Sequence, residues 1–439
     1  MRRASSPSPP QTAEVAALNH DGEGVVRAEK TAFVPGALPG ELITFRRTRR
    51  HRQHDEAELL SIERTSPDRV EPRCAHFGVC GGCALQHLAP EAQLAAKQVE
   101  VAENLSRIGR VSPERWLEPL TGPVWQYRRR ARLGAKFVTK RGRVLVGFRE
   151  RSSPYIAALS RCEILAPPVD ALIEPLALLL TGLQAHRTIP QIEVAVGDEV
   201  TVLVFRHLEP LSPADEAALL AFERERGVRV YLQPGGPSTV RPLSGVAASL
   251  RYRVAPGEAE LAFEPTDFVQ INAAINARLV PLALEQLEVG ATDRVLDLFC
   301  GLGNFTLPLA CRAQEVVGVE GDASLVARAR ENARSNGIEN VRFHVANLFE
   351  ADGGAMALQG SFSRVLLDPP RAGALEVLPR LAALGAERIV YVSCHPGTLA
   401  RDLGVLCHDH GYRLVAAGVI DMFPHTPHIE SMAVLERAR

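Results

Sequence analysis

The chain has 439 residues, of which 46% are hydrophobic and 23% charged, a composition typical of a soluble globular protein with about two to four domains. Its formal net charge of −1 excludes a strong overall field for polyanions, and no apolar run reaches the ~18 residues that a membrane helix needs. The opening residues, MRRASSPSPPQTAE, lack the apolar segment of a secretory signal, so we expect a cytoplasmic protein with a disordered tail over residues 1–12.

Residues 13–66 predict a small β-barrel. Apolar stretches alternate with Gly and Pro in GEGVVRAEKTAFVPGALPGELITFRR, and EAELLSIER adds a further strand. Several short strands at this spacing are typical of a small barrel.

Two runs of basic residues stand out against the neutral total. Arg46–Arg52 holds five arginines and one histidine, and Arg128–Arg151 holds ten Lys and Arg residues with one acid. A single basic run is more often a solvated face than a binding site. Two such runs in the first half of a neutral protein favour a polyanionic partner.

Three cysteines cluster in the loop-like residues 66–90. CAHFGVCGGC places Cys74, Cys80 and Cys83 in a C-x5-C-x2-C spacing, and Cys162, in LSRCEIL, is the obvious fourth thiol. Four such thiols in a cytosolic chain indicate a metal site rather than disulfides. The spacing alone does not choose between zinc and an iron–sulfur cluster.

Residues 67–265 predict a central domain of mixed helices and strands that carries the cysteine cluster. A helix pattern covers residues 91–108. Further strands are expected near 143–149, 191–206 and 228–232, with helices near 168–184 and 212–226.

Residues 266–439 have the rhythm of a doubly wound α/β domain. The strand-like runs RVLDLF, EVVGVE, VRFHVA, RVLLDPP and RIVYVSC alternate with helix-like stretches. This alternation predicts a parallel, Rossmann-like sheet.

A glycine turn follows the first of these strands. In VLDLFCGLGNFTLPLA the strand ends near Asp297, and Gly301 and Gly303 form a tight turn before a helix. The missing third glycine of G-x-G-x-x-G argues against a dinucleotide site and so against a dehydrogenase. Glu320, nineteen residues after Gly301, suits ribose hydroxyls, and Asn347 suits an adenine edge.

Two later strands end in residues that could take part in a reaction. LLDPPRAG places Asp368 before two prolines, a rigid loop that suits a methyltransferase holding a flat substrate. VYVSCHPGTLARDL places Cys394 where a buried strand stops. Core packing is the alternative for this thiol, but the rim of an α/β sheet is where ligands bind.

The chain resembles the RNA uracil-C5 methyltransferase family over nearly its whole length. The matching pieces occur in the family's order: FVQIN, DLFCGLGNFTLPLA, VVGVE, LDPPRAG, YVSCHPGTLARDL and DMFPHTPHIESMAVLER. Together they are highly specific, whereas the glycine loop or LDPPR alone is not.

The resemblance implies roles for the candidate residues. Cys394 would add to C6 of uracil, and Glu430, in HIESM, would remove the C5 proton after methyl transfer. A thiol of ordinary pKa ~8.5 needs positive or donor groups nearby, for which His395 and Arg371 are candidates. S-adenosylmethionine would contact Gln270, Phe299, Asn304, Glu320, Asn347 and Asp368.

The resemblance also implies a second cofactor and a substrate. Cys74, Cys80, Cys83 and Cys162 would hold a [4Fe–4S] cluster that acts as a folding clamp. The barrel resembles a TRAM domain, which binds RNA through basic grooves and stacking aromatics. Aromatics are few here, with Phe33 and Phe45 as the candidates, so we expect binding to depend mainly on Lys30 and the first arginine run. Within the family, barrel and cluster together imply 23S rRNA, at a uridine of the position-1939 type, with base flipping. No protein partner is implied, and we expect a monomer.

Other functions remain open on the sequence. One is the same chemistry on another 23S uridine or on tRNA, and another is a non-catalytic RNA-binding protein. A 5-methylcytosine enzyme is a third, but such enzymes commonly carry a second cysteine after the Asp-Pro-Pro-type loop. Here Arg371, Ala372 and Gly373 follow.

Overall fold

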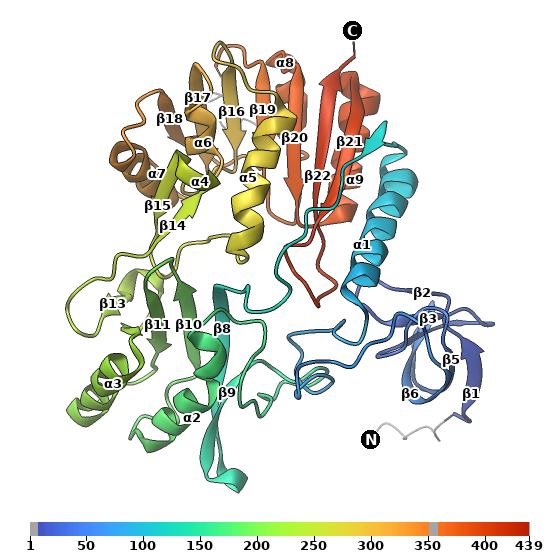
Figure 1. The fold of residues 1–439 in the computed structure, drawn as a ribbon, viewed down its shortest axis with the longest axis vertical. Helices are drawn as coiled ribbons and strands as arrows, with labels where there is room; N and C mark the ends of the chain where they lie inside the picture. Colours follow the sequence, from blue (N-terminus) through green and yellow to red (C-terminus); the bar gives the residue numbers. More distant parts are fainter. Residues whose placement is uncertain (1–7, 351–358, 439) are drawn as a thin grey trace. The chain divides into compact units, whose positions relative to one another are not determined.

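The computed structural model describes residues 8–350 and 359–438, which form two compact units (Figure 1). The first unit contains the chain up to Glu100 together with Arg149–Tyr155 and Phe423–His428. The second contains Val101–Phe148, Ile156–Met422 and Ile429–Arg439. Residues 1–7 of the expected disordered tail lie outside the described residues, and its last two residues, Gln11 and Thr12, belong instead to the first strand, Gln11–Glu14. None of the described helices is long and apolar enough to cross a membrane.

The first unit begins with a six-stranded sheet in the order β1-β5-β6-β4-β3-β2. Alternate residues of its strands enclose a small apolar core that includes Val26, Val34, Ile43 and Phe45. Because Phe45 is only 1% exposed, its expected role as a stacking platform for RNA is wrong. The strands are β1 Gln11–Glu14, β2 Ala17–Leu18, β3 Gly24–Val26, β4 Thr31–Val34, β5 Leu42–Arg50 and β6 His54–Arg64.

Part of the basic surface of this sheet is neutralised internally. Lys30 Nζ lies 2.6 Å from one oxygen of the buried Asp55 carboxylate, and Arg47 Nη1 lies 2.8 Å from the other. Arg46 pairs with Glu58 at 3.1 Å. Lys30 therefore pairs with a carboxylate within the sheet. Fewer positive charges of the arginine run are available for RNA than its composition indicates.

Helix α1, Pro90–Asn104, follows the cysteine loop and continues as one π-helical turn, Leu105–Gly109, which confirms the predicted helix. Within the first unit, its Gln93 accepts a hydrogen bond from His425 N at 2.9 Å. Lys97 Nζ donates to Phe423 O at 3.0 Å. Ala84 N and Leu85 N both donate to His425 O at 3.0 Å. The segment Phe423–His428 is thus fixed by residues more than three hundred positions earlier.

The second unit contains a six-stranded sheet in the order β13-β12-β11-β10-β8-β9. Strand β8 lies inside the second basic run, where arginines pair with acids on neighbouring elements, such as Arg132 with Glu193 at 3.1 Å. The elements are β8 Arg130–Val138, β9 Arg143–Gly147, α2 Ile173–Gly182, β10 Gln191–Val196, β11 Thr201–Arg206, α3 Pro213–Arg226, β12 Arg229–Gln233 and β13 Arg241–Pro242.

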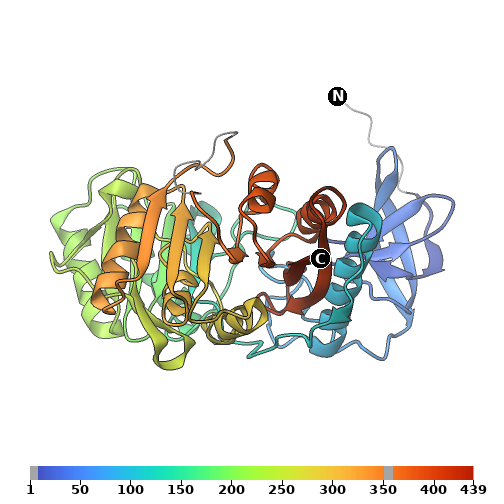
Figure 2. The same cartoon turned by 90° about the horizontal axis from the view of Figure 1, so that it is seen from above.

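The second unit also contains an eight-stranded sheet in the order β18-β17-β16-β19-β20-β22-β21-β7, with helices on both faces (Figures 1 and 2). The first five strands are mutually parallel, which confirms the predicted doubly wound sheet. Its strands are β7 Arg115–Trp116, β16 Arg294–Leu298, β17 Glu315–Glu320, β18 Val341–Val345, β19 Arg364–Leu367, β20 Arg388–Ser393, β21 Tyr412–Ile420 and β22 Glu430–Arg437.

The helices beside this sheet are amphipathic and mostly capped. Asn272 caps α5, Asp322 caps α7 and His395 caps α9, each with its side chain accepting a backbone N–H. The helices are α5 Ala273–Leu287, α6 Thr306–Ala310, α7 Ala323–Ser335, α8 Leu378–Ala383 and α9 Pro396–His410. A hairpin of β14 Arg251–Val254 and β15 Ala259–Ala262, joined by the short α4 Ala255–Glu258, precedes α5.

Candidate active site

The candidate site lies at the carboxyl edge of the parallel strands. Strand order reverses direction between β16 and β19, and ligands of doubly wound sheets bind outside such a switch point. The polar residues predicted from sequence end or follow these strands, namely Glu320, Asn347, Asp368 and Cys394.

Strand register places Cys394 beside Glu430. β20 and β22 run antiparallel with Ser393 opposite Ser431, so the residues just beyond this pair, 394 and 430, meet at the same edge. Ser431 Oγ donates to Ser393 O at 3.2 Å and fixes this end of the ladder. The predicted nucleophile and the predicted base therefore come together from opposite ends of a motif that spans 37 residues of chain.

The site is rich in carboxyl groups, and these groups are buried. Burial, followed by the charges of Glu430 and Asp368, raises the pKa of the Cys394 thiol to about 11, against a lowering by Arg371. Glu430 is only 3% exposed, and burial raises its pKa well above the ordinary value. Burial also raises the pKa of Asp368 to about 7, against a hydrogen bond from Gln270 Nε2 at 3.3 Å. In the free protein, therefore, the thiol is largely protonated at neutral pH.

His395, a candidate for activating the thiol, serves the adjacent helix instead. Its Nδ1 accepts the backbone N–H of Thr398 at 3.2 Å, which caps α9. Arg371 is the positive group whose charge acts on Cys394.

The glycine turn after β16 forms as the sequence predicts. Phe299, Gly301 and Gly303 all have positive φ, at 63°, 55° and 100°, a conformation that favours glycine and strains Phe299. One Glu320 oxygen accepts from Gly301 N at 3.1 Å, and the other accepts from Asp322 N at 3.0 Å. Glu320 therefore holds the turn in place as well as standing where ribose hydroxyls are expected.

The remaining predicted contacts differ in their surroundings. Asn347 is exposed, and its side chain bonds to Phe349 N at 3.1 Å and Glu350 at 2.9 Å. Asn304 bonds in both directions with Asn276, at 2.8 and 3.0 Å, and accepts from Tyr252 Oη at 3.2 Å. Asn304 is thus held by neighbours that the sequence did not single out.

Three more residues at this edge escaped the sequence analysis. Phe349 lies with its ring 5.7 Å from that of Phe299, and the two ring planes are tilted by 50°, so each ring presents its own aromatic face. Asp297 is buried inside the strand, where burial raises its pKa to about 8 and Thr306 Oγ1 donates to it at 2.6 Å. The acid in the apolar run VLDLF was the available signal for Asp297. Asp402 is fully buried under the Asp-Pro-Pro loop.

The four predicted metal ligands are thiols, not halves of disulfides. Cys74 lies near enough to Cys80 to raise the pKa of that thiol, although burial is the larger cause. Cys74, Cys80 and Cys83 belong to the first unit, and Cys162 belongs to the second. Among residues 8–350 and 359–438, no three Cys, His, Asp or Glu side chains are arranged as a metal-binding group. The four thiols have the right chemistry for an iron–sulfur cluster.

A glycine turn that holds the carboxylate of Glu320, a pair of aromatic rings, and a thiol next to a buried carboxyl are features that fit a methyltransferase acting on an unsaturated ring. The family model described as tRNA (Uracil-5-)-methyltransferase matches residues 251–438. A protein of Stenotrophomonas maltophilia named 23S rRNA (uracil(1939)-C(5))-methyltransferase RlmD is 50% identical over 98% of this chain and 97% of its own length. A protein of the same name from Alkalilimnicola ehrlichii is 52% identical over 99% and 98%.

A solved structure is also similar over nearly the whole chain. The tRNA (uracil-54, C5)-methyltransferase of Pyrococcus abyssi, crystallised with S-adenosyl-L-homocysteine, has a TM-score of 0.75 and 25% identity. The match covers 97% of this chain and 100% of that one. The chain belongs to the family of 23S rRNA (uracil(1939)-C(5))-methyltransferases.

Proposed function

We propose that this protein transfers a methyl group from S-adenosylmethionine to C5 of uridine 1939 in 23S rRNA. The full-length identity of 50% to proteins named for this reaction supports the reaction and its substrate. The observation that supports the chemistry is the meeting of Cys394 and Glu430 at one end of the β20–β22 ladder.

Each residue has a defined task in the proposed reaction. The Cys394 thiolate forms a bond to C6 of uracil, and the C5–C6 π electrons move to make C5 nucleophilic. S-adenosylmethionine, when bound, supplies the methyl cation equivalent that C5 takes up. Ionised Glu430 then removes the proton from C5, and the C6–S bond breaks to release the thiolate. Burial raises the proton affinity of Glu430, which suits a base that must remove a proton from carbon.

The residues of the glycine turn are suited to the methyl donor. Phe299 and Phe349 would flank its adenine, Glu320 its ribose, and Asn347 the adenine edge. Asp368 and Gln270, which hydrogen-bond to each other, would face its amino-acid part or the target base. Asn304 would contact the methyl donor from the position in which its hydrogen bonds to Asn276 and Tyr252 hold it.

We also propose that Cys74, Cys80, Cys83 and Cys162 bind a [4Fe–4S] cluster with a structural role. The C-x5-C-x2-C spacing and the family resemblance support this proposal. The purified protein, handled without oxygen, should contain about four iron and four sulfide per chain and absorb near 400 nm. Cys162→Ser should lose the cluster, and Cys311→Ser, at an exposed thiol, should keep it. One zinc and no iron would contradict the proposal.

The six-stranded sheet of the first unit is proposed as a TRAM-type RNA-binding domain. We further propose that residues 67–265 form a central domain and 266–439 the catalytic domain of a cytoplasmic monomer. The exposed Arg49 and Arg50 and the half-buried Phe33 support an RNA-binding role for the sheet.

The proposed reaction can be tested by the loss of tritium from C5 of uridine. A 23S rRNA transcript labelled there should release tritium to water only with both enzyme and S-adenosylmethionine. Cys394→Ala should abolish release. Methylation without release would move the reaction to another atom and contradict the proposal.

A further inference from the structure

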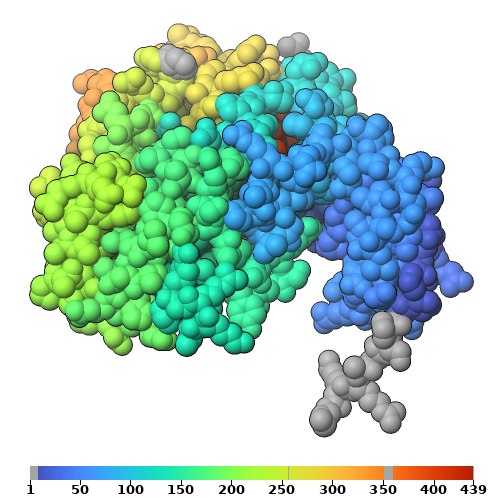
Figure 3. Space-filling model, turned by 60° about the horizontal axis from the view of Figure 1, so that its bottom comes forward, coloured from blue at the N-terminus to red at the C-terminus, as the bar shows by residue number. Residues whose placement is uncertain are grey.

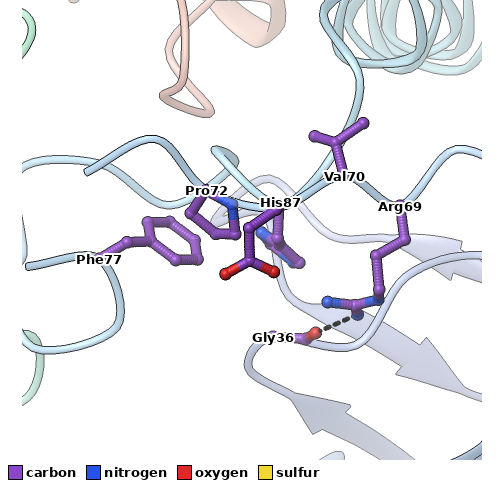
Figure 4. A pocket seen from close by; sticks show the side chains of 7 residues that line it. Gly36, Arg69, Val70, Pro72, Phe77 and His87 are labelled. Carbon is purple, nitrogen blue, oxygen red and sulfur yellow. Dashed lines mark hydrogen bonds between the residues drawn. The ribbon is translucent and has the colours of Figure 1, made fainter. Parts of the chain in front are cut away.

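A pocket of about 480 Å³ lies in the first unit, between the six-stranded sheet and the cysteine loop (Figure 4). Figure 3 shows part of the surface of this unit in blue. Pockets of this size hold small molecules or single groups of larger ones. The residues that matter to its chemistry are Gly36, Arg69, Glu71, Pro72, Phe77 and His87.

His87 gives the pocket wall unused hydrogen-bonding capacity. The side chain is only 2% exposed, and neither ring nitrogen has a hydrogen-bond partner within the described chain. Burial and the charges of Arg69 and Arg151 lower its pKa to about 4, so the ring is neutral and has one donor and one acceptor nitrogen. Buried polar groups without a partner are rare and costly, which points to a ligand that supplies one.

The charges of the pocket disfavour an anion. Arg69 donates to both Glu41 oxygens, at 2.6 and 2.8 Å, and to Gly36 O at 2.7 Å, so its guanidinium is already satisfied. Glu71 adds a carboxylate to the lining. A phosphate would therefore meet a negative charge and a neutralised arginine.

The lining of the pocket includes an aromatic ring. The Phe77 ring lies 5.2 Å from the His87 ring, and Pro72 lies beside them (Figure 4). Aromatic faces of this kind stack on nucleobases whatever their sequence. Neutral histidine and a carboxylate suit the N–H donors and ring nitrogens at the edge of a base.

We propose that this pocket binds one unpaired nucleobase of the RNA substrate, stacked on Phe77 with its polar edge toward Glu71 and His87. The inference rests on the proposed function for the identity of the RNA. It assigns the first unit a contact with one base, in addition to the proposed contacts of its arginines with the phosphate backbone of the RNA.

The test uses the full-length protein and a 23S rRNA transcript that contains uridine 1939. Phe77→Leu removes the aromatic face but keeps apolar volume, and Glu71→Gln removes only a charge on an exposed side chain. Each should raise Kd and KM for the transcript about tenfold, with kcat at saturating RNA unchanged. Glu91→Gln, on exposed α1 in the same unit, is the matched control and should behave as the wild type.

Transcripts with one abasic nucleotide at each unpaired position in turn identify the base. At one position, the wild type and Phe77→Leu should bind the abasic RNA equally weakly. Iron content and melting temperature are measured for every preparation, because Phe77 lies between Cys74 and Cys80.

Two outcomes separate this proposal from the proposed function. If the wild type releases tritium and both variants bind like Glu91→Gln, the pocket proposal is overturned and the reaction stands. If the wild type releases no tritium but the variants and one abasic RNA show the expected loss of binding, the pocket stands and the reaction is wrong.

Discussion

The Cys394 thiol lies among carboxyl groups, and its charge balance depends on one arginine. Glu430 and Asp368 raise the pKa of the thiol, while Arg371 lowers it. The ionised fraction at neutral pH is therefore small, and every positive charge near the sulfur increases it. Methyl transfer should speed up as pH rises toward the thiol pKa, until another group limits the rate.

Arg371→Met should raise the pKa of Cys394 further and slow its alkylation by iodoacetamide about threefold to tenfold between pH 8 and 9. The rate is measured by mass spectrometry of the peptide that contains Cys394. Arg380→Met, which removes a positive charge in α8 rather than in the loop after Asp368, is the control. Equal alkylation rates in the wild type and Arg371→Met would show that Arg371 does not act on the sulfur.

Glu430→Gln should leave an RNA adduct that cannot be resolved. The amide has no basic oxygen for the C5 proton, so the methylated intermediate should stay bound to Cys394. A band of enzyme joined to labelled RNA should persist on a denaturing gel and be absent from Cys394→Ala/Glu430→Gln. Normal turnover by Glu430→Gln would remove the residue from its proposed role.

At the scale of elements, the side chain of Asp402 links a strand, a loop and a helix. It accepts hydrogen bonds from Tyr391 Oη at 2.6 Å in β20, Ala374 N at 2.7 Å in the loop after Asp368, and Arg401 Nε at 2.8 Å in α9. A Cβ atom at Gly373 would lie 2.5 Å from the Asp402 carboxylate, so only glycine fits beside it. The loop that carries Asp368 is therefore positioned by the helix that follows Cys394.

Asp402→Asn should lower kcat about tenfold or more, because it displaces the loop that carries Asp368 and Arg371. Tyr391→Phe, which removes one of the three bonds, should cost about 1 kcal/mol in the free energy of unfolding by urea. Asp409→Asn, exposed on the same helix, is the control. A normal kcat in Asp402→Asn would contradict a role in positioning the loop.

The elements also show how far sequence reasoning reaches. The parallel strands and the glycine turn are local patterns, and the structure contains them where they were predicted. Strand β8 was missed because its arginines resemble a solvated run, although Arg132 pairs with Glu193 across strands. Phe45 was misjudged although β5 alternates buried and half-buried residues over Leu42–Phe45. The meeting of Cys394 with Glu430 depends on strand register, which no local pattern gives, and only the family resemblance predicted it.

At the scale of the molecule, the segment before Glu430 belongs to the first unit. Gln93 holds this segment by accepting from His425 N at 2.9 Å, while its own amide donates to Leu85 O and Leu88 O at 3.0 and 2.7 Å. Glu430 lies two residues beyond the end of the segment at His428. The position of the proposed base is thus covalently tied to contacts around the cysteine loop.

Gln93→Leu should loosen this segment without touching the catalytic residues. The variant removes the side-chain partner of His425 N, Leu88 O and Leu85 O, of which Leu85 O keeps the N–H of Leu88, and a buried backbone group left unpaired costs about 1–3 kcal/mol. Hydrogen exchange of the peptide spanning 423–430 should become faster, and kcat should fall. Gln98→Leu, on the same helix, is the control. Unchanged exchange in Gln93→Leu would mean that the segment is held by other contacts.

The path of the chain through the two units has a consequence for synthesis. The polypeptide leaves the first unit after Glu100, returns at Arg149–Tyr155, and returns again at Phe423–His428. Ala84 and Leu85 cannot bond to His425 until the ribosome has made almost the entire chain. The packing of the first unit is therefore completed only after residues 423–428 have been synthesised. Before then, a nascent chain cannot hold Glu430 in place. An rRNA-modifying enzyme built in this way becomes competent only when its translation is nearly finished.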